Sequence, residues 1–276
     1  MKKLIHFSII FLIGISAACS QSKDVRQVDF FNAIHSAGSW DVYIKKGSSE
    51  RVIIEADSGP IEKILTEVDG DKLTIKMEER SWSFSNNFRN VKIFVTFTEL
   101  GEINGSGSGT IRLESPLDSE DISIKSSGSG NFYAEEDLIA ADYLRIINSG
   151  SSTVKLMAKV SAGDESDITN SGSGDIEIKG LFADELEINN SGSGGIKIGG
   201  GEIDSQSIRL SGSGNMQMED LKSRNCEIRK SGSGNVYVSV SDLLSGSSSG
   251  SGNVYVKSGK PKLDFHFSGS GKIKYL

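Results

Sequence analysis

The sequence predicts an all-β protein: a single-stranded parallel β-helix with coils of about 20 residues and an irregular N-terminal half that includes one short helix. Three observations lead to this prediction. A Ser-Gly-Ser-Gly tetrapeptide recurs along the chain, apolar residues recur at fixed distances from it, and those residues alternate with polar ones in the period of a strand. The repeated part offers no helical period of 3.6 residues.

The tetrapeptide occurs nine times, at steps of 18 to 22 residues. Every copy has Ser, Gly and Ser in its first three places, and only Ser152 replaces the last glycine. A fixed period of this length is the signature of a solenoid. The copies begin at Ser106, Ser127, Ser149, Ser171, Ser191, Ser211, Ser231, Ser249 and Ser268.

Aligning the flanks on the first serine reveals columns of apolar residues. The places five and seven residues downstream are always apolar or aromatic, as at Ile176 and Ile178, with Glu177 between them. A second column lies three residues upstream, where seven of the nine copies have isoleucine and only Gly246 is not apolar and bulky. Stacked coils would bury these columns against one another and pair their strands about 4.8 Å apart.

The motif itself allows two structures. Its glycines can form a corner of the coil, where they adopt a conformation closed to other residues. Alternatively, the strand runs straight through, so that the glycines face the core and the serines form outward columns. The asparagines that follow the motif in four coils predict hydrogen-bonded ladders; they are Asn131, Asn215, Asn235 and Asn253.

The remaining chain divides into a signal at 1–18, a tether at 19–27, and one β-helix domain at 28–276, irregular over 28–104 and regular over 105–276. Ile61 to Val68, after Pro60, is the predicted short helix. The strands expected in the irregular part are Val28 to Phe31, Trp40 to Ile44, Arg51 to Ala56, Lys72 to Met77 and Val91 to Thr96.

The first residues resemble a bacterial lipoprotein signal. Lys2 and Lys3 precede a short apolar run, and small residues lead directly to Cys19. We expect an exported protein, anchored by lipid on Cys19, in the cell envelope and at the outer membrane. The alternative is an ordinary secretory signal cleaved near Ala18. With Cys19 lipidated, Cys226 has no partner for an intrachain disulfide.

The charge excludes several partners. The chain carries −7, and loss of Lys2 and Lys3 leaves 28 basic against 37 acidic residues, or −9. Such a surface disfavours nucleic acid and charge-driven binding to anionic lipid.

Several segments together resemble the auto-transporter adhesin head, or GIN, domain family of envelope proteins. The resemblance covers about residues 28 to 276 and implies a β-helical exported domain, often on a lipoprotein, with no established enzyme activity. The segments that carry it are Phe31 with Ile34, Asp41-Val42-Tyr43-Ile44, Ile61 to Val68, Lys72-Leu73-Thr74-Ile75, and Leu100 to Gly109.

No constellation in the sequence predicts catalysis, a cofactor or a metal. His35 and His266 lie at opposite ends of the domain without triad or metal spacing. Asp167 and Glu187 occupy the same place in consecutive coils, so a carboxylate pair is conceivable, although a solvated face explains them better. The chain is predicted not to be an enzyme.

Two groups of aromatic residues are candidates for a ligand surface. Tyr237 and Tyr255 share an outward place in consecutive coils, which suits sugars or apolar ligands but equally suits a cross-strand pair. Trp82 and Phe84 lie in an expected loop, or else cap the core. The leading hypothesis is a non-enzymatic envelope protein that binds a glycan or a protein. The alternatives are a structural spacer or assembly module, a carbohydrate-active enzyme and, more remotely, a hydroxyl array that orders water.

Overall fold

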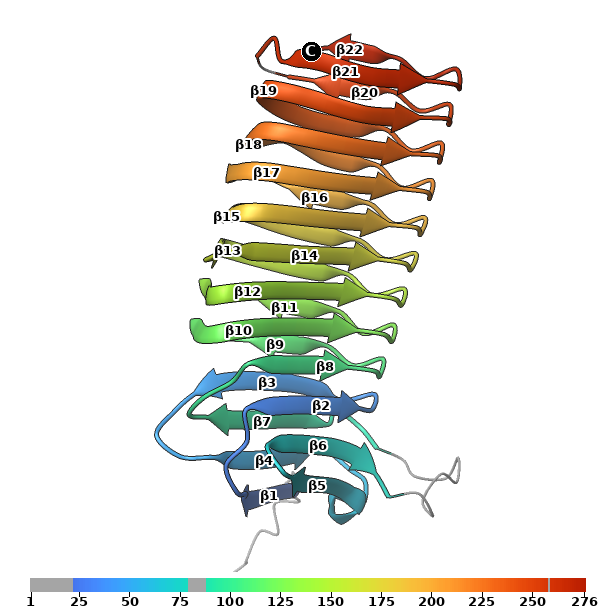
Figure 1. Cartoon of the computed structure of the whole chain (residues 1–276). Helices are drawn as coiled ribbons and strands as arrows, with labels where there is room; N and C mark the ends of the chain where they lie inside the picture. Colours follow the sequence, from blue (N-terminus) through green and yellow to red (C-terminus); the bar gives the residue numbers. More distant parts are fainter. Residues whose placement is uncertain (1–21, 79–87, 258) are drawn as a thin grey trace, which may run out of the picture.

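The computed structural model describes residues 22–78, 88–257 and 259–276. The chain forms one straight stack of parallel coils, with its N-terminal strands at one end and its C-terminus at the other (Figure 1). The predicted parallel β-helix of about 20-residue coils is confirmed.

Each regular coil has a short strand after the tetrapeptide and a longer, bent run of strand that leads to the next tetrapeptide. In three coils, at residues 176–190, 216–230 and 236–248, the two merge into one long strand. The strands are β8 (Glu102–Gly105), β9 (Ile111–Leu113), β10 (Leu117–Ser126), β11 (Phe132–Ala134), β12 (Leu138–Asn148), β13 (Val154–Ala162), β14 (Glu165–Asn170), β15 (Ile176–Asn190), β16 (Ile196–Ile198), β17 (Gly201–Leu210), β18 (Met216–Lys230), β19 (Val236–Ser248), β20 (Val254–Val256), β21 (Lys262–Phe267) and β22 (Ile273–Tyr275).

The predicted apolar columns form the core. Ile176 pairs in register with Ile196, and Ile188 pairs with Ile208, so like residues stack from coil to coil. All four side chains are at most 1% exposed, and each contributes roughly 1.5–3 kcal/mol by leaving water. A third apolar column, which alignment on the motif did not predict, lies on the remaining side of the coil; it includes Leu117, Leu138, Val160, Leu181 and Leu221.

The tetrapeptides form the turns along one edge of the stack (Figure 1). Their serines face solvent, as the interpretation of a straight strand required. The glycines, however, do not face an opposing wall of the core, as that interpretation also required. A Cβ added to the first glycine of each motif would lie 1.7–2.3 Å from the carbonyl oxygen of a glycine in the preceding coil. None of the motif glycines has φ in the left-handed region. Glycine is therefore required by the close approach of stacked backbones.

Hydrogen bonds join these turns from coil to coil. The amide of Ser193 donates to the oxygen of Gly172 at 3.1 Å, and the amide of Ser213 donates to Gly192 at 3.2 Å. Ser152, in place of the second glycine of its motif, turns its side chain inward and donates to Oδ1 of Asn148 at 2.8 Å. The second glycine column thus accepts a side chain in one coil, whereas the first is glycine throughout.

Buried asparagines close the turns from inside. The residue before the motif points inward, and Nδ2 of Asn170 donates to the oxygen of Gly174 at 2.8 Å. Asn190 does the same to Gly194 at 2.9 Å. These side-chain amides donate hydrogen bonds to carbonyls inside the turns. A buried carbonyl without a partner would cost folding free energy.

The asparagine ladder exists, but it joins side chain to backbone. Oδ1 of Asn215 accepts the amide of Asn235, and Oδ1 of Asn235 accepts the amide of Asn253, both at 2.9 Å. Oδ1 of Asp175 accepts the amide of Gly195 in the same way at 2.7 Å.

The N-terminal part begins the solenoid and closes its lower end. β2 (Ala33–Ala37) and β3 (Asp41–Lys46) pair in parallel with β8 and β9 and form the first coil. Below them, β6 (Lys72–Met77) and β7 (Lys92–Phe97) also pair in parallel with this coil. The antiparallel strands β1 (Ser22–Gln27), β4 (Arg51–Ala56) and β5 (Ile64–Asp69) complete this end.

Three local predictions were wrong. The helix at Ile61 to Val68 is one 3-10 turn, η1 (Ile61–Lys63), followed by β5, because residues 64–69 pair with β6. Residues 22–27 of the expected tether form β1, paired with β4; Nη1 of Arg26 also donates to Thr66 at 3.1 Å. Val28 to Phe31 lies between β1 and β2 and is not a strand.

Within the described residues, no helix is long and apolar enough to cross a membrane.

The close approach of the turns predicts that Gly212→Ala destabilises the fold strongly. The new Cβ would lie 1.8 Å from the oxygen of Gly192, so two coils would have to separate. We expect a loss of at least ~3 kcal/mol in the free energy of unfolding, measured by chemical denaturation. Ser213→Ala, in the same turn but exposed, is the control and should change stability by less than ~0.5 kcal/mol. Equal stability of the two variants would contradict the packing argument.

Candidate ligand-binding surface

The outward residues form columns that run the length of the stack. Residues six places after the first serine of each motif line one wall of the solenoid. Residues two and four places before that serine line another. Register partners in parallel strands lie about 4.8 Å apart, so side chains of neighbouring coils contact one another. The surface is therefore a set of parallel rows of side chains.

Tyr237 and Tyr255 lie on the first wall and stack on each other. Their ring centroids are 4.6 Å apart and the rings are 6° from parallel. The ammonium of Lys274 lies over the Tyr255 ring, 5.5 Å from its centroid. Each tyrosine therefore covers one ring face of the other, which leaves less ring face for a ligand than two isolated tyrosines would offer.

The same wall has a second aromatic group near its N-terminal end. Tyr43 stacks on Phe94 at 5.1 Å, and the guanidinium of Arg112 lies 4.7 Å from the Tyr133 centroid. Tyr43 and Arg112 are register partners, so the two contacting pairs lie in one row across four neighbouring strands. Alignment on the motif could not place Tyr43 and Phe94 here, because their coils have no tetrapeptide.

The other predicted site residues lie outside the described part of the chain. These are Trp82 and Phe84 in the expected loop, and Cys19 at the predicted lipid attachment.

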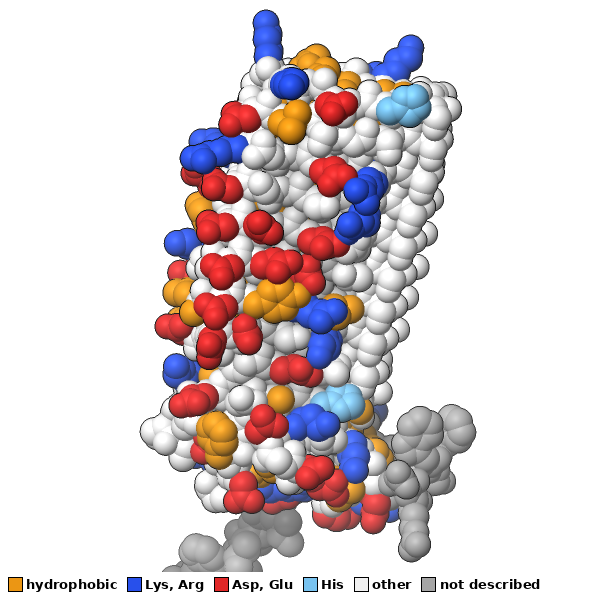
Figure 2. Space-filling model, viewed as in Figure 1, with side chains coloured by type: hydrophobic (Ala, Val, Ile, Leu, Met, Phe, Trp, Pro, Cys, Tyr) orange, Lys and Arg blue, Asp and Glu red, His pale blue; other side chains and the backbone are white. Residues whose placement is uncertain are grey.

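Carboxylates gather on the second wall, over the middle coils (Figure 2). Asp167 and Glu187 are register partners, and with Glu165 they place three carboxylates within 4.8 Å of one another. We call these three residues and Glu185 the acidic cluster. Burial, with the charges of the other three carboxylates, raises the pKa of Glu165. The Tyr143 hydroxyl donates to Asp167 at 2.5 Å, and burial together with this bond raises the pKa of Tyr143 to about 12.

The cluster brings the predicted acid pair together, but on an exposed sheet face. Carboxylate oxygens are ligands that Ca²⁺ prefers, yet groups of carboxylates are common on protein surfaces that bind no ion. Arg209 bonds to Glu187 and offsets part of the charge. Glu165, Glu185 and Glu187 line an open groove of about 280 Å³, whereas active sites exclude water by enclosure.

The histidines and the cysteine do not add a catalytic group to this cluster. His35 pairs in register with Asn104 in the first coil, and His266 pairs with Ser247 in the last, so they lie at opposite ends of the stack. Nε2 of His35 lies 3.1 Å from Oγ of Ser106, and burial lowers the pKa of His35. The Cys226 thiol is buried, which raises its pKa and makes the reactive thiolate scarce.

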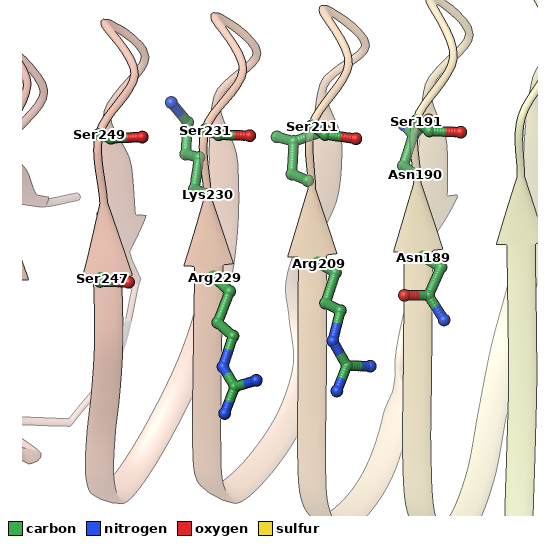
Figure 3. A pocket seen from close by; sticks show the side chains of 11 residues that line it. Asn189, Asn190, Ser191, Arg209, Ser211, Arg229, Lys230, Ser231, Ser247 and Ser249 are labelled. Carbon is green, nitrogen blue, oxygen red and sulfur yellow. The ribbon is translucent and has the colours of Figure 1, made fainter.

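A shallow groove of about 420 Å³ crosses four coils between the second wall and the turns (Figure 3). Arg209 and Arg229 project from neighbouring strands on one side, and Ser191, Ser211 and Ser231 line the other. We call it the arginine groove. Sequence reasoning missed it, although the spacing of both arginines to the motif would have placed them in one column.

The fold and these rows of side chains define the class of protein: a β-solenoid with a long, patterned and mostly open surface. The family model "Putative auto-transporter adhesin, head GIN domain" matches residues 30–164 and again 157–261. The chain belongs to this family, as the resemblance in its sequence indicated. A comparison with curated proteins found no match.

Solved structures share the fold at low sequence identity. A "putative adhesin" from Parabacteroides distasonis has a TM-score of 0.71 at 20% identity, covering 93% of this chain and 97% of that one. A "putative lipid binding protein" from the same species has a TM-score of 0.67 at 24% identity, covering 93% and 96%. A "putative adhesin" from Parabacteroides merdae has a TM-score of 0.63 at 19% identity, also covering 93% and 96%.

The acidic cluster predicts that Glu165→Gln stabilises the protein at neutral pH. Since folding raises the pKa of this carboxyl, its ionised form opposes folding above that pKa, and protonation removes the penalty at lower pH. We expect the melting temperature at pH 7 to rise by a few degrees or less, corresponding to under ~1 kcal/mol at an exposed site. The gain should shrink as the pH falls below the pKa.

Glu177→Gln is the matched control, because Glu177 pairs with Lys155 at 2.7 Å. It should give no gain at pH 7. A gain from Glu165→Gln that persists undiminished at pH 3 would show that charge repulsion is not its cause.

Proposed function

We propose that this protein is a non-enzymatic, lipid-anchored protein of the cell envelope that presents its rigid β-helix for adhesion. One observation carries the proposal: the outward columns form an extended wall of aligned side chains, while the core is filled by apolar columns. Such a wall offers repeated contacts to an extended partner without an enclosed site. Membership in a family described as adhesin heads supports the same function.

The anchor in this proposal is Cys19, lipidated after cleavage of residues 1–18. Its support is the basic start, the short apolar run and the small residues before the cysteine. Multiple acyl chains hold a protein on a membrane without a spanning segment. The outer membrane is the proposed location, and the partner is a glycan or another protein.

Two alternatives remain as proposals of lower rank. A structural spacer is favoured by the mutual stacking of Tyr237 and Tyr255, because such pairs stabilise neighbouring strands without a ligand. A carbohydrate-active enzyme would use Asp167 and Glu187, which do lie together but on an open face. The tyrosine pair also remains a candidate part of the adhesive wall, through its exposed ring edges.

Replacement of Cys19 tests the anchor directly. In cells fed an alkyne fatty acid, the wild-type protein should take up label and sediment with membranes, whereas Cys19→Ala should lose both properties. Cys226→Ala is the matched control, because it removes the only other cysteine and should stay labelled. Label retained by Cys19→Ala would contradict the anchor.

The same strains test adhesion. Protease added to intact cells should digest the wild-type domain if it faces outward, and those cells should aggregate or adhere more than cells of a deletion strain. A protected domain, with adhesion equal to that of the deletion strain, would contradict the adhesive function and leave the spacer as the better account.

A further inference from the structure

The arginine groove has rows of hydrogen-bonding groups at the spacing of the coils. The hydroxyls of Ser191, Ser211, Ser231 and Ser249 stand in one row beyond the strand ends (Figure 3). Their side chains face solvent, and among the described residues their hydroxyls have no hydrogen-bond partner. Each can donate one hydrogen bond and accept others. The row therefore matches an extended ligand that carries hydroxyl groups along its length.

Two arginines form the opposite side of the groove. Arg209 and Arg229 are register partners on β17 and β18, and their side chains are 46% and 61% exposed. Like charges directly opposite each other destabilise a sheet by roughly 0.2–1 kcal/mol. Arg209 bonds through Nη1 to Glu187, and Arg229 bonds through Nε and Nη2 to Glu227. Each guanidinium has five N–H donors, so both retain donors for an anion.

A third cation lines the groove at its turn end (Figure 3). Lys230 follows Arg229 on β18 but points inward and is only 3% exposed. Its Nζ donates to the oxygen of Gly232 at 2.7 Å, and among the described residues no carboxylate pairs with it. The charged groups nearest to Lys230 are Arg229 and Glu227 on its own strand and Arg209 on β17. Its register partner on β19, Ser248, is neutral. Burial lowers the pKa of this lysine.

The turn does not require a charge at this position. The equivalent residues of the neighbouring coils are Asn190, Leu210 and Ser248, all neutral. A buried, unpaired ammonium costs folding free energy, and here it adds positive potential to a groove that already has two arginines. On a chain of charge −7, two register-paired arginines and the lysine that follows one of them in sequence indicate a local site for negative charge.

We propose that the arginine groove binds an anionic polysaccharide, with its chain parallel to the solenoid axis, its hydroxyls on the serine row and its acidic groups on Arg209 and Arg229. The inference deepens the proposed adhesive function and rests on it. Arginine is suited to this role because its planar fork bonds carboxylate, sulfate and phosphate groups through paired hydrogen bonds. The acidic remainder of the surface repels such polymers, which confines binding to the groove.

The test measures binding of the whole mature domain to three immobilised polymers: polygalacturonate for carboxylate, dextran sulfate for sulfate, and unmodified dextran as the neutral control. We expect binding to at least one charged polymer and none to dextran, with affinity that falls as salt rises. The double variant Arg209→Gln and Arg229→Gln should bind at least about tenfold more weakly, since charge-assisted hydrogen bonds are lost.

Lys230→Leu separates ligand binding from folding. Leucine already occupies this place in the preceding coil, as Leu210, so the variant should fold and show unchanged circular dichroism. We expect its affinity for the charged polymer to fall about threefold, because only the potential behind the groove changes. The double variant Lys179→Gln and Lys197→Gln removes two exposed charges from elsewhere on the solenoid and is the matched control.

Binding that survives the arginine variant, or falls equally in the lysine control, would overturn the inference. So would equal binding to dextran, or no binding to either charged polymer. These outcomes leave the adhesion and protease tests on whole cells unaffected, so failure of this site is distinguishable from failure of the adhesive function.

Discussion

The structure depends on the close approach of successive coils at the tetrapeptide turns. At the first motif glycine, the Cα of one coil lies so near the carbonyl of the preceding coil that no Cβ fits between them. Parallel strands of neighbouring coils must keep a spacing of about 4.8 Å along their whole length. A turn that needed more room would force the strands apart on both sides. The glycines thus let the turns keep the spacing that the strands require.

This constraint separates the parts of each coil that maintain the fold from the parts that are free to vary. The inward columns are filled with isoleucine, leucine and valine, and buried asparagines such as Asn190 bond the turn carbonyls. The outward columns contribute little to that packing. Arginine, lysine, tyrosine and glutamate replace one another there from coil to coil without changing the register. Function on such a scaffold is best sought where an outward column breaks its own pattern, as at Arg209 and Arg229.

Much of the fold could be predicted from the sequence, because residues that contact each other in neighbouring coils of a solenoid are separated by a nearly fixed number of residues. The pairs Ile188 with Ile208 and Tyr237 with Tyr255 followed from counting alone. The third apolar column escaped because its distance from the first motif serine is not constant: it is eleven residues at Leu117, Leu138 and Val160, but ten at Leu181 and Leu221. The helix at residues 61–68 was wrong because pairing with β6 overrides the weak local preference of a short segment.

The candidate site was less predictable for a different reason. The arginine groove joins residues two places before the motif with the motif serines, and a column-by-column alignment treats these as unrelated rows. Lys230 is harder still, since a lysine among polar residues gives no sign that it points inward, as its 3% exposure shows. Comparison with Asn190 and Leu210, which occupy the same place in neighbouring coils, shows that the turn does not require a charge there.

Hydrogen exchange tests the central claim about the turns most directly. The amides of Ser193 and Ser213 belong to exposed turn residues, yet each donates to a glycine oxygen of the preceding coil. If the turns are locked together, these amides exchange as slowly as the core amides of Ile188 and Ile208, and far more slowly than the amide of Gly70 in the exposed turn between β5 and β6. Exchange of the serine amides at the rate of Gly70 would show that the turns are not locked together, and would contradict the account.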